Sequence, residues 1–182
     1  MDAHVALLRA INVAGRNILP MKDLVALFEA AGCADVRTYI QSGNVVYRAP
    51  AALAARLPQL LHARIEERFG LDVPVVTRTA RELARAARSN PYLLAGADAA
   101  ACHLAFLAAK PSAAQIASLD PKRSPPDAFT VVGREIYLHC PKGLGGSKLT
   151  NQYFDAKLGT TSTVRNWRTV LTLLEMTAAR GD

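Results

Sequence analysis

Apolar residues recur along the chain with two alternating periods, which predicts strands and helices in alternation. An apolar run over residues 4–8 predicts a strand, and helical spacing after Pro20 predicts a helix that ends at Gly32. Two β-prone runs, 36–40 and 44–48, are joined by a Gln-Ser-Gly turn and predict a hairpin. An amphipathic helix over 53–69, with Pro58 as a kink or as its true start, and a strand over 73–77 follow. The order β-α-β-β-α-β is that of a ferredoxin-like unit.

The second half of the chain has a similar order. A helix opened by the capping box Thr79 to Glu82 ends near Arg88, before a Ser-Asn-Pro break. Then come a strand over 101–108, a short helix over 112–119, a hairpin over 128–140, a helix over 147–158 and a last helix over 164–178. Trp167 lies in the apolar stripe of that last helix, which predicts a core position. No residue-level repeat between the halves is visible.

We therefore predict an α+β fold of two tandem ferredoxin-like (βαββα-type) subdomains with a C-terminal helix. Residues 1–90 form the first unit with its following helix, 91–99 form a linker, and 100–182 form the second unit. With 51% hydrophobic residues in a chain of 182, a sizeable core can be buried.

Charge favours polyanionic partners, since the formal net charge is +7. The excess is spread over the chain, with 12 basic and 8 acidic residues in 1–91 and 10 and 7 in 92–182. Arginine in an alanine-rich chain is equally explained by genomic base composition. Three cysteines without a C-x-x-C motif, no signal peptide and no long apolar stretch predict a soluble, cytoplasmic protein without a membrane partner.

Several segments together resemble one bacterial family. They are 7–13, 36–46, 69–75, 132–135, 147–149 and 163–167, and the segment from Thr38 to Val46 is the most specific. On these stretches the chain resembles the family called domain of unknown function 1697. The resemblance implies two ferredoxin-like subdomains and carries no established activity, cofactor or catalytic residue. The family pattern tends to have Gly at positions 10 and 14, where this chain has alanine, and often Asn at position 168, where it has arginine.

Two cationic segments near the C-terminus are the main candidate site. Both fall at the predicted start of a helix, where the macrodipole already adds partial positive charge, so an anion is expected to balance them. The glycine-rich segment is not a Walker A motif, because Ser147 separates the last glycine from Lys148. The alternatives are a flexible turn with an ordinary cap, and arginines paired to the protein's own carboxylates. The predicted phosphate- or anion-binding residues are Gly145, Gly146, Ser147, Lys148, Thr163, Arg165, Asn166 and Arg168.

A second polar cluster is predicted where the loop after the first strand and the first hairpin turn approach one sheet edge. Its side chains suit hydrogen bonding to a base, sugar or phosphate, and they suit turn formation equally well. The cluster comprises Arg9, Asn12, Arg16, Asn17, Gln41, Ser42 and Asn44.

Other chemistry is disfavoured. Cys102-His103 and His139-Cys140 alternate between sheet faces, so they do not predict a metal site, and no cofactor is predicted. Aromatic residues are too few on the central strands for ribonucleoprotein-type RNA recognition. Catalytic residues cannot be named from the sequence.

Three hypotheses follow. The first is a phosphate-recognising binding protein for nucleic acid or a nucleotide. The second is a small enzyme acting on a phosphorylated metabolite. The third is a homodimeric interaction or scaffold module.

Overall fold

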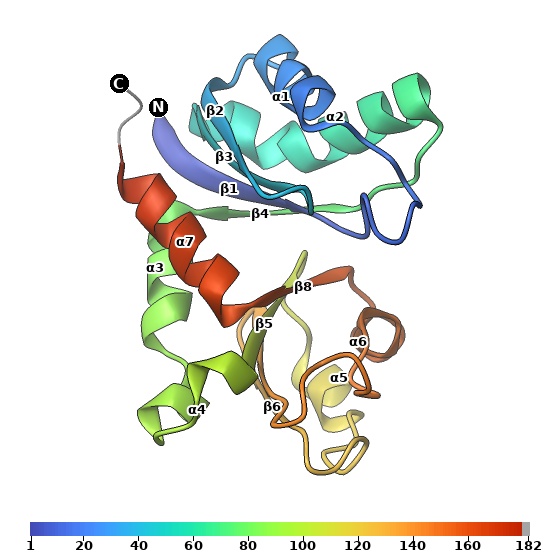
Figure 1. The fold of residues 1–182 in the computed structure, drawn as a ribbon, viewed down its shortest axis with the longest axis vertical. Coiled ribbons are helices and arrows are strands. Elements are labelled where there is room, and N and C mark those ends of the chain that lie inside the picture. The colour runs from blue at the N-terminus through green and yellow to red at the C-terminus, as the bar shows by residue number, and fades with distance from the viewer. Residues whose placement is uncertain (180–182) are drawn as a thin grey trace. The chain divides into compact units, whose positions relative to one another are not determined.

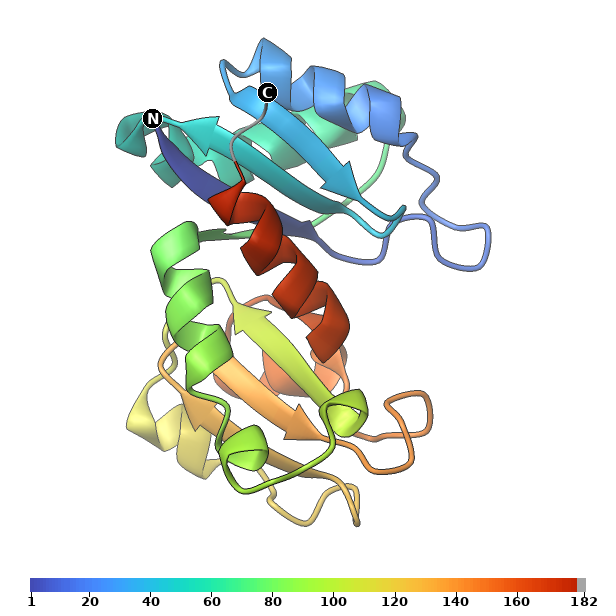
Figure 2. The same cartoon turned by 60° about the vertical axis from the view of Figure 1, so that its left-hand side comes forward.

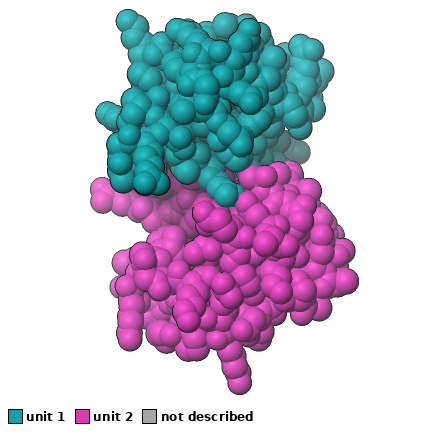
Figure 3. Space-filling model, turned by 90° about the vertical axis from the view of Figure 1, so that its right-hand side faces the viewer, with its two compact units in different colours: residues 1–84, 172–182 teal, residues 85–171 magenta. Residues whose placement is uncertain are grey.

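The computed structural model describes residues 1–179. The chain divides into two compact units (Figure 3). Unit 1 consists of Met1–Ala84 together with the residues from Thr172 onward, and unit 2 consists of Arg85–Leu171.

Unit 1 is a four-stranded antiparallel sheet with two helices on one face (Figure 1). The strand order is β2-β3-β1-β4, so the first strand of the chain lies between the third and the fourth, as in a ferredoxin-like fold. Its elements are β1 (Asp2–Leu8), α1 (Met21–Ala30), β2 (Ala34–Tyr39), β3 (Asn44–Ala49), α2 (Ala51–Phe69) and β4 (Val75–Thr79), and α3 (Ala80–Arg88) begins in unit 1 and ends in unit 2. The helix α2 continues through Pro58.

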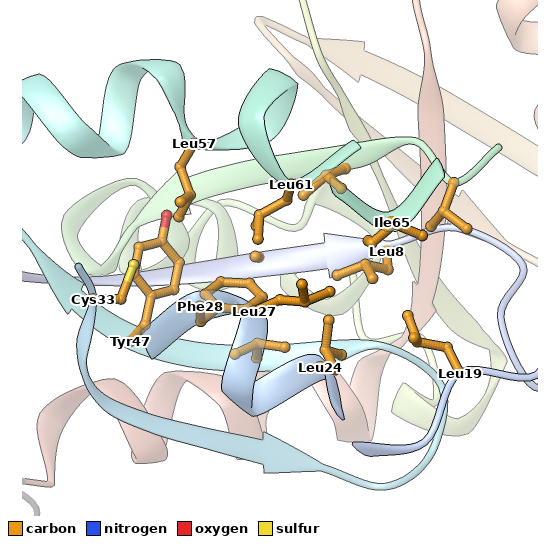
Figure 4. Close-up of a cluster of buried hydrophobic side chains, with 14 of the residues drawn as sticks. Leu8, Leu19, Leu24, Leu27, Phe28, Cys33, Tyr47, Leu57, Leu61 and Ile65 are labelled. Atoms are coloured by element: carbon orange, nitrogen blue, oxygen red, sulfur yellow. The ribbon is translucent and has the colours of Figure 1, made fainter. Parts of the chain in front are cut away.

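The core of unit 1 lies between these two helices and the sheet (Figure 4). Leu24 and Phe28 of α1 and Leu61 of α2 are fully buried against Leu8 and Tyr47. Each such side chain contributes about 1.5–3 kcal/mol by leaving water. The apolar residues that recur at helical spacing in α1 and α2 and those of the strands therefore pack together in one core.

Unit 2 has the same arrangement, with strand order β6-β7-β5-β8. Its elements are α4 (Pro91–Leu94), the 3-10 turn η1 (Ala99–Ala101), β5 (Cys102–Leu107), α5 (Ala113–Ala117), β6 (Ala128–Val132), β7 (Glu135–His139), α6 (Asn151–Leu158) and β8 (Ser162–Asn166), and α7 (Trp167–Ala178) begins in unit 2 and ends in unit 1. The segment predicted as a linker includes α4. The predicted core position of Trp167 is confirmed, since this side chain is 3% exposed.

The strand β8 corrects the sequence-based prediction. Residues from Val164 onward were expected to begin the last helix, but Ser162–Asn166 pairs antiparallel with β5. Unit 2 is thus a complete βαββαβ unit followed by a helix, as unit 1 is.

The strand registers reveal a sequence repeat that the primary structure alone does not show. In unit 1, His4 is opposite Thr79 and Val5 is opposite Arg78. In unit 2, His103 is opposite Asn166 and Leu104 is opposite Arg165. This register aligns His-Val-Ala-Leu-Leu (4–8) with His-Leu-Ala-Phe-Leu (103–107), and it places an arginine one residue before the end of each fourth strand. The two units therefore repeat one βαββαβ arrangement with the same strand order and register, which we call the frame.

The units differ in the length of three connections. The β1–α1 connection spans residues 9–20, whereas its counterpart between β5 and α5 spans only 108–112. Conversely, Pro50 alone joins β3 to α2, whereas residues 140–150 join β7 to α6. Residues 31–33 join α1 to β2, whereas residues 118–127 join α5 to β6. Long connections that a frame does not require are places where binding residues concentrate.

Candidate functional site

The glycine-rich segment lies in the β7–α6 connection and not at a helix start. The helix α6 begins at Asn151, and its cap is Thr150, whose hydroxyl accepts from the Tyr153 N–H at 3.2 Å. Ser147 closes a shorter turn instead, since its hydroxyl accepts from the Leu149 N–H at 3.1 Å. The predicted helix start at Ser147 is therefore wrong, and the helix dipole does not act on Lys148 as expected.

Three of the backbone N–H groups around Lys148 are used inside the protein. The Ser147 N–H donates to the Leu144 carbonyl at 3.0 Å, and the Lys148 N–H donates to the Ser124 hydroxyl at 3.0 Å. Together with the Leu149 N–H, these donors are already used inside the protein. The N–H groups of Ser147, Lys148 and Leu149 therefore do not contribute to an anion cradle, and phosphate binding by the backbone of Gly145 and Gly146 stays a prediction.

Two glycines of this loop have no internal reason to be glycine. A Cβ built on Gly145 or Gly146 would meet no atom within 4 Å, and neither residue has a positive φ. By contrast, Gly143 has a φ of +82°, which favours glycine. Glycines without a steric or torsional need leave the backbone open to close approach from outside.

A second loop, between α5 and β6, is hydrogen-bonded to the glycine-rich segment of the β7–α6 connection. The Arg123 Nε donates to the Lys148 carbonyl at 3.0 Å, and its guanidinium lies over the Tyr153 ring at 4.0 Å from the centroid. The Tyr153 hydroxyl in turn accepts from the Asp120 N–H at 2.8 Å. These contacts fix the position of a cation beside Lys148.

The two loops together form a cationic surface that we name the loop-pair site. It comprises the exposed residues Lys122 and Arg123 of one loop and Lys142, Gly145, Gly146 and Lys148 of the other. The two carboxylates of these loops are turned to internal donors: Asp120 accepts from the Lys122 N–H at 2.9 Å and Asp127 accepts from the Ser124 hydroxyl at 2.8 Å. No ion pair found within residues 1–179 involves any of the four cations.

Lys122, Arg123 and Lys142 were missed by reasoning from the sequence. The adjacent Lys-Arg pair in a proline-rich loop was a signal, but it lies far along the chain from Lys148. Only the tertiary hydrogen bonds bring the two loops together.

The predicted arginine pair after residue 160 is arranged differently from expectation. Arg165 lies in β8 and Arg168 lies in α7, so the helical i, i+3 spacing does not apply to them. Arg165 is half-buried, with Nη1 donating to the Thr163 hydroxyl at 2.7 Å and to the Val164 carbonyl at 2.9 Å. Burial lowers the pKa of its guanidinium to about 10, so it stays charged at neutral pH.

The cap of α7 is Asn166 and not Thr163. The Asn166 Oδ1 accepts from the Thr169 N–H at 2.8 Å, whereas Thr163 is 1% exposed within the sheet. The helix-start geometry predicted for Arg165 and Thr163 is therefore wrong. Anion binding by Arg165 and Arg168 stays a prediction.

The N-terminal polar cluster is brought together as expected, but its amides are used within the protein. The Asn12 Nδ2 donates to the Leu19 and Gln41 carbonyls at 2.9 and 2.8 Å, and its Oδ1 accepts from the Leu19 N–H at 2.8 Å. Asn17 Nδ2 donates to the Ala10 carbonyl at 2.9 Å. Asn44 is fully buried and donates to the Ser42 hydroxyl at 2.9 Å. These side chains build turns, whereas the side chains of Arg16 and Gln41 are exposed.

The cysteines and histidines do not converge on an ion. Among residues 1–179, no three His, Cys, Asp or Glu side chains are placed to hold a metal. Cys33, Cys102 and Cys140 are free and buried, and desolvation raises the pKa of Cys33 and of Cys140 to about 11. Such thiols stay protonated at neutral pH and are poor nucleophiles.

A surface cavity of about 280 Å³ lies where β1 and α3 begin. It is lined by Asp2, Ala3, Thr79, Ala80 and Arg81. The Thr79 hydroxyl accepts from the Glu82 N–H at 3.1 Å and Glu82 Oε2 accepts from the Thr79 N–H at 2.9 Å, which completes the predicted capping box. The Thr79 hydroxyl also donates to Glu82 Oε2 at 3.2 Å, so both side chains are used in the cap at the start of α3.

The fold and these surfaces define an α+β protein built from a repeated ferredoxin-like frame, with one distinctive connection in unit 1 and two in unit 2. The chain belongs to the family described as "Protein of unknown function (DUF1697)", which its sequence matches over residues 1–137. The structure is similar to that of the conserved bacterial protein SP0830 from Streptococcus pneumoniae, with a TM-score of 0.75 at 18% identity over 98% of this chain and 99% of that one. This similarity supports the fold. Curated proteins include no match to the sequence. None of the helices within residues 1–179 has the length and apolar character needed to cross a bilayer.

Proposed function

We propose that this protein binds the phosphate groups of a nucleic acid through the loop-pair site. The observation that carries the proposal is the surplus of exposed cations on two mutually locked loops whose carboxylates face internal donors. Phosphodiester backbones are recognised by such point charges without a deep pocket. The net charge of +7 favours the same partner.

The geometry favours a polymer over a single nucleotide. The side chains of Lys122, Lys142 and Lys148 are all exposed to solvent. Arg123 is the one cation of the site whose side chain is fixed on both sides, by Tyr153 and by the Lys148 carbonyl. Gly145 and Gly146 allow a backbone to approach closely because no side chain projects there.

We assign no reaction to the protein, since the Thr79 hydroxyl at the cavity at the start of α3 and the Glu82 carboxylate beside it are both used in the helix cap. We place it in the cytoplasm, because its cysteines are free thiols.

The test is the binding of a fluorescein-labelled single-stranded oligonucleotide, measured by fluorescence anisotropy over a series of salt concentrations. Affinity should fall steeply with salt, and the double substitution Lys142→Ala/Lys148→Ala should weaken binding. If each lysine contacts one phosphate, the slope of log K against log salt should decrease in magnitude by about 1.4 for a single strand.

The matched control is Lys157→Ala, which removes an exposed lysine from the last turn of α6, outside the site. It should change affinity much less than the double substitution. Equal losses in both variants would show a non-specific charge effect and would contradict the proposed site. Absence of binding by the wild-type protein at low salt would contradict the function.

A further inference from the structure

The β1–α1 connection of unit 1 is an ordered hairpin that projects from the sheet (Figure 2). Val13 bridges Arg16, and the Asn12 N–H donates to the Asn17 carbonyl at 3.0 Å. Ala14 and Gly15 at the tip have φ values of 48° and 73°, as in the tight turns that suit hairpins. We name residues 9–19 the hairpin loop.

The base of the hairpin loop is anchored in the core. Ile11 and Leu19 are 1% and 0% exposed, and Asn12 ties the loop to both Leu19 and the β2–β3 turn. In that turn, a Cβ on Gly43 would lie 2.6 Å from the Leu8 Cβ, so the turn packs directly against the end of β1. The hairpin loop is therefore held in one conformation before any partner arrives.

Apolar side chains of this region also face outward. Val13, Ile18 and Ile40 are 56%, 58% and 53% exposed, and they are three of the exposed large apolar residues of the described chain. Two lie on the hairpin loop and the third on the turn to which Asn12 is bonded. Exposed apolar side chains gathered on a rigid projection are typical of a protein interaction surface.

The conformation of the hairpin loop is strained, and the frame does not require it. Ala10, Asn12, Ala14 and Asn17 have φ values between 48° and 56°, each at a cost of roughly 1 kcal/mol for a residue other than glycine. Unit 2 makes the corresponding connection with residues 108–112. The positive φ at 10 and 14 also explains why the family resemblance implies glycine there. Strain beyond the needs of the fold indicates that the shape itself is used.

The charge of the surface selects the partner. The hairpin loop and the turn at 40–43 carry Arg9 and Arg16 and include no Asp or Glu. We propose that this surface docks an acidic segment of another protein in which aliphatic side chains alternate with Asp or Glu. Carboxylates of the segment would reach Arg16 while its aliphatic groups cover Val13, Ile18 and Ile40.

This partner fits better than a nucleic acid or a lipid bilayer. Neither the hairpin loop nor the 40–43 turn includes an aromatic residue on which a base could stack or that would sit at a bilayer interface. The inference is independent of the loop-pair site, which lies in unit 2.

The test is selection of peptides from a random display library on the full-length protein, followed by affinity measurement with the selected synthetic peptide. Selected sequences should combine Asp or Glu with Val, Ile or Leu. The variants Val13→Ser/Ile18→Ser and Arg16→Glu should each weaken binding about tenfold or more. These side chains are exposed, so thermal melting should show that both variants fold.

Leu94→Ser is the matched control, because Leu94 is a 77% exposed apolar residue of unit 2. It should leave peptide affinity unchanged, as should Lys142→Ala/Lys148→Ala. Selection of peptides without acidic residues, or no loss in the hairpin-loop variants, would overturn the inference. Binding of the wild type to phosphatidylglycerol–phosphatidylcholine vesicles that Val13→Ser/Ile18→Ser abolishes would overturn it in favour of a lipid surface.

Discussion

Unit 1 and unit 2 share strand order, register and the His-x-Ala-x-Leu strand, yet unit 1 has one long connection that unit 2 lacks and unit 2 has two that unit 1 lacks. The hairpin loop of unit 1 is anchored, strained and partly apolar, whereas the loop-pair site of unit 2 is cationic and contains glycines without internal contacts. The shared frame accounts for the core of both units, but it does not account for the length of the connections 9–20, 118–127 and 140–150. Function is therefore best sought in the connections, and the two candidates differ in chemistry.

The largest expected effect contrasts glycines of the two units. Gly43→Ala should destabilise the protein by about 3 kcal/mol, because the new Cβ meets Leu8 and Ile11 and because φ is +77°. Gly145→Ala should change stability by less than about 0.5 kcal/mol, since nothing lies near its Cβ. Urea denaturation monitored by circular dichroism measures both, and equal effects would refute the contrast.

Buried tyrosines sharpen the comparison of the two cores. The Tyr137 hydroxyl donates to the Ala86 carbonyl at 2.9 Å within unit 2, whereas the buried Tyr47 hydroxyl of unit 1 has no hydrogen-bond partner among the described residues. Tyr137→Phe should cost about 1–2 kcal/mol. Tyr47→Phe should be neutral or stabilising by up to about 1 kcal/mol. A loss of stability in Tyr47→Phe would show that this hydroxyl has a partner.

The strain of the hairpin loop predicts a smaller effect of opposite sign. Ala14→Gly should raise the free energy of unfolding by about 1 kcal/mol, because the left-handed conformation no longer costs energy. Ala26→Gly, in the middle of α1, should lower it by about 1 kcal/mol. The same urea experiment measures both, and a destabilised Ala14→Gly would argue against strain at the tip.

The equivalent histidines predict a modest pH dependence in both units. Burial lowers the pKa of His4, against a smaller opposing effect of Asp2, and burial also lowers the pKa of His103. The unfolded chain takes up protons near the ordinary value of 6.5 while the folded chain does so only at lower pH, so stability is lost as pH falls below about 6.5. His4→Gln/His103→Gln should flatten the plot of unfolding free energy between pH 7 and 5. An unchanged slope would place the responsible groups elsewhere.

Most of the frame could be predicted from the sequence, because the spacing of apolar residues and the glycines and prolines that end the elements can be read within short stretches of the chain. The strand β8 was missed since Val164 and Trp167 are three residues apart and extend a helical stripe, while pairing with β5 decided the conformation. The start of α6 was misplaced because Ser147 and Thr150 are both good caps, and only hydrogen bonding distinguishes them.

The candidate sites were predictable only in part. Lys148 was recognised, but its neighbour Arg123 is brought to it by a long-range hydrogen bond. For Asn12, sequence reasoning left a turn role and a ligand role equally open, and the structure assigns the turn role. Local patterns thus identified residue types, whereas the surfaces depend on contacts between distant segments.

The most direct test of the loop-pair site is a titration of ¹⁵N-labelled protein with a short single-stranded oligonucleotide, followed by amide chemical-shift changes. Binding at this site predicts that the largest changes fall within residues 120–127 and 141–150 and that they shrink as salt is raised. Changes concentrated instead in the hairpin loop, or no changes at low salt, would contradict it.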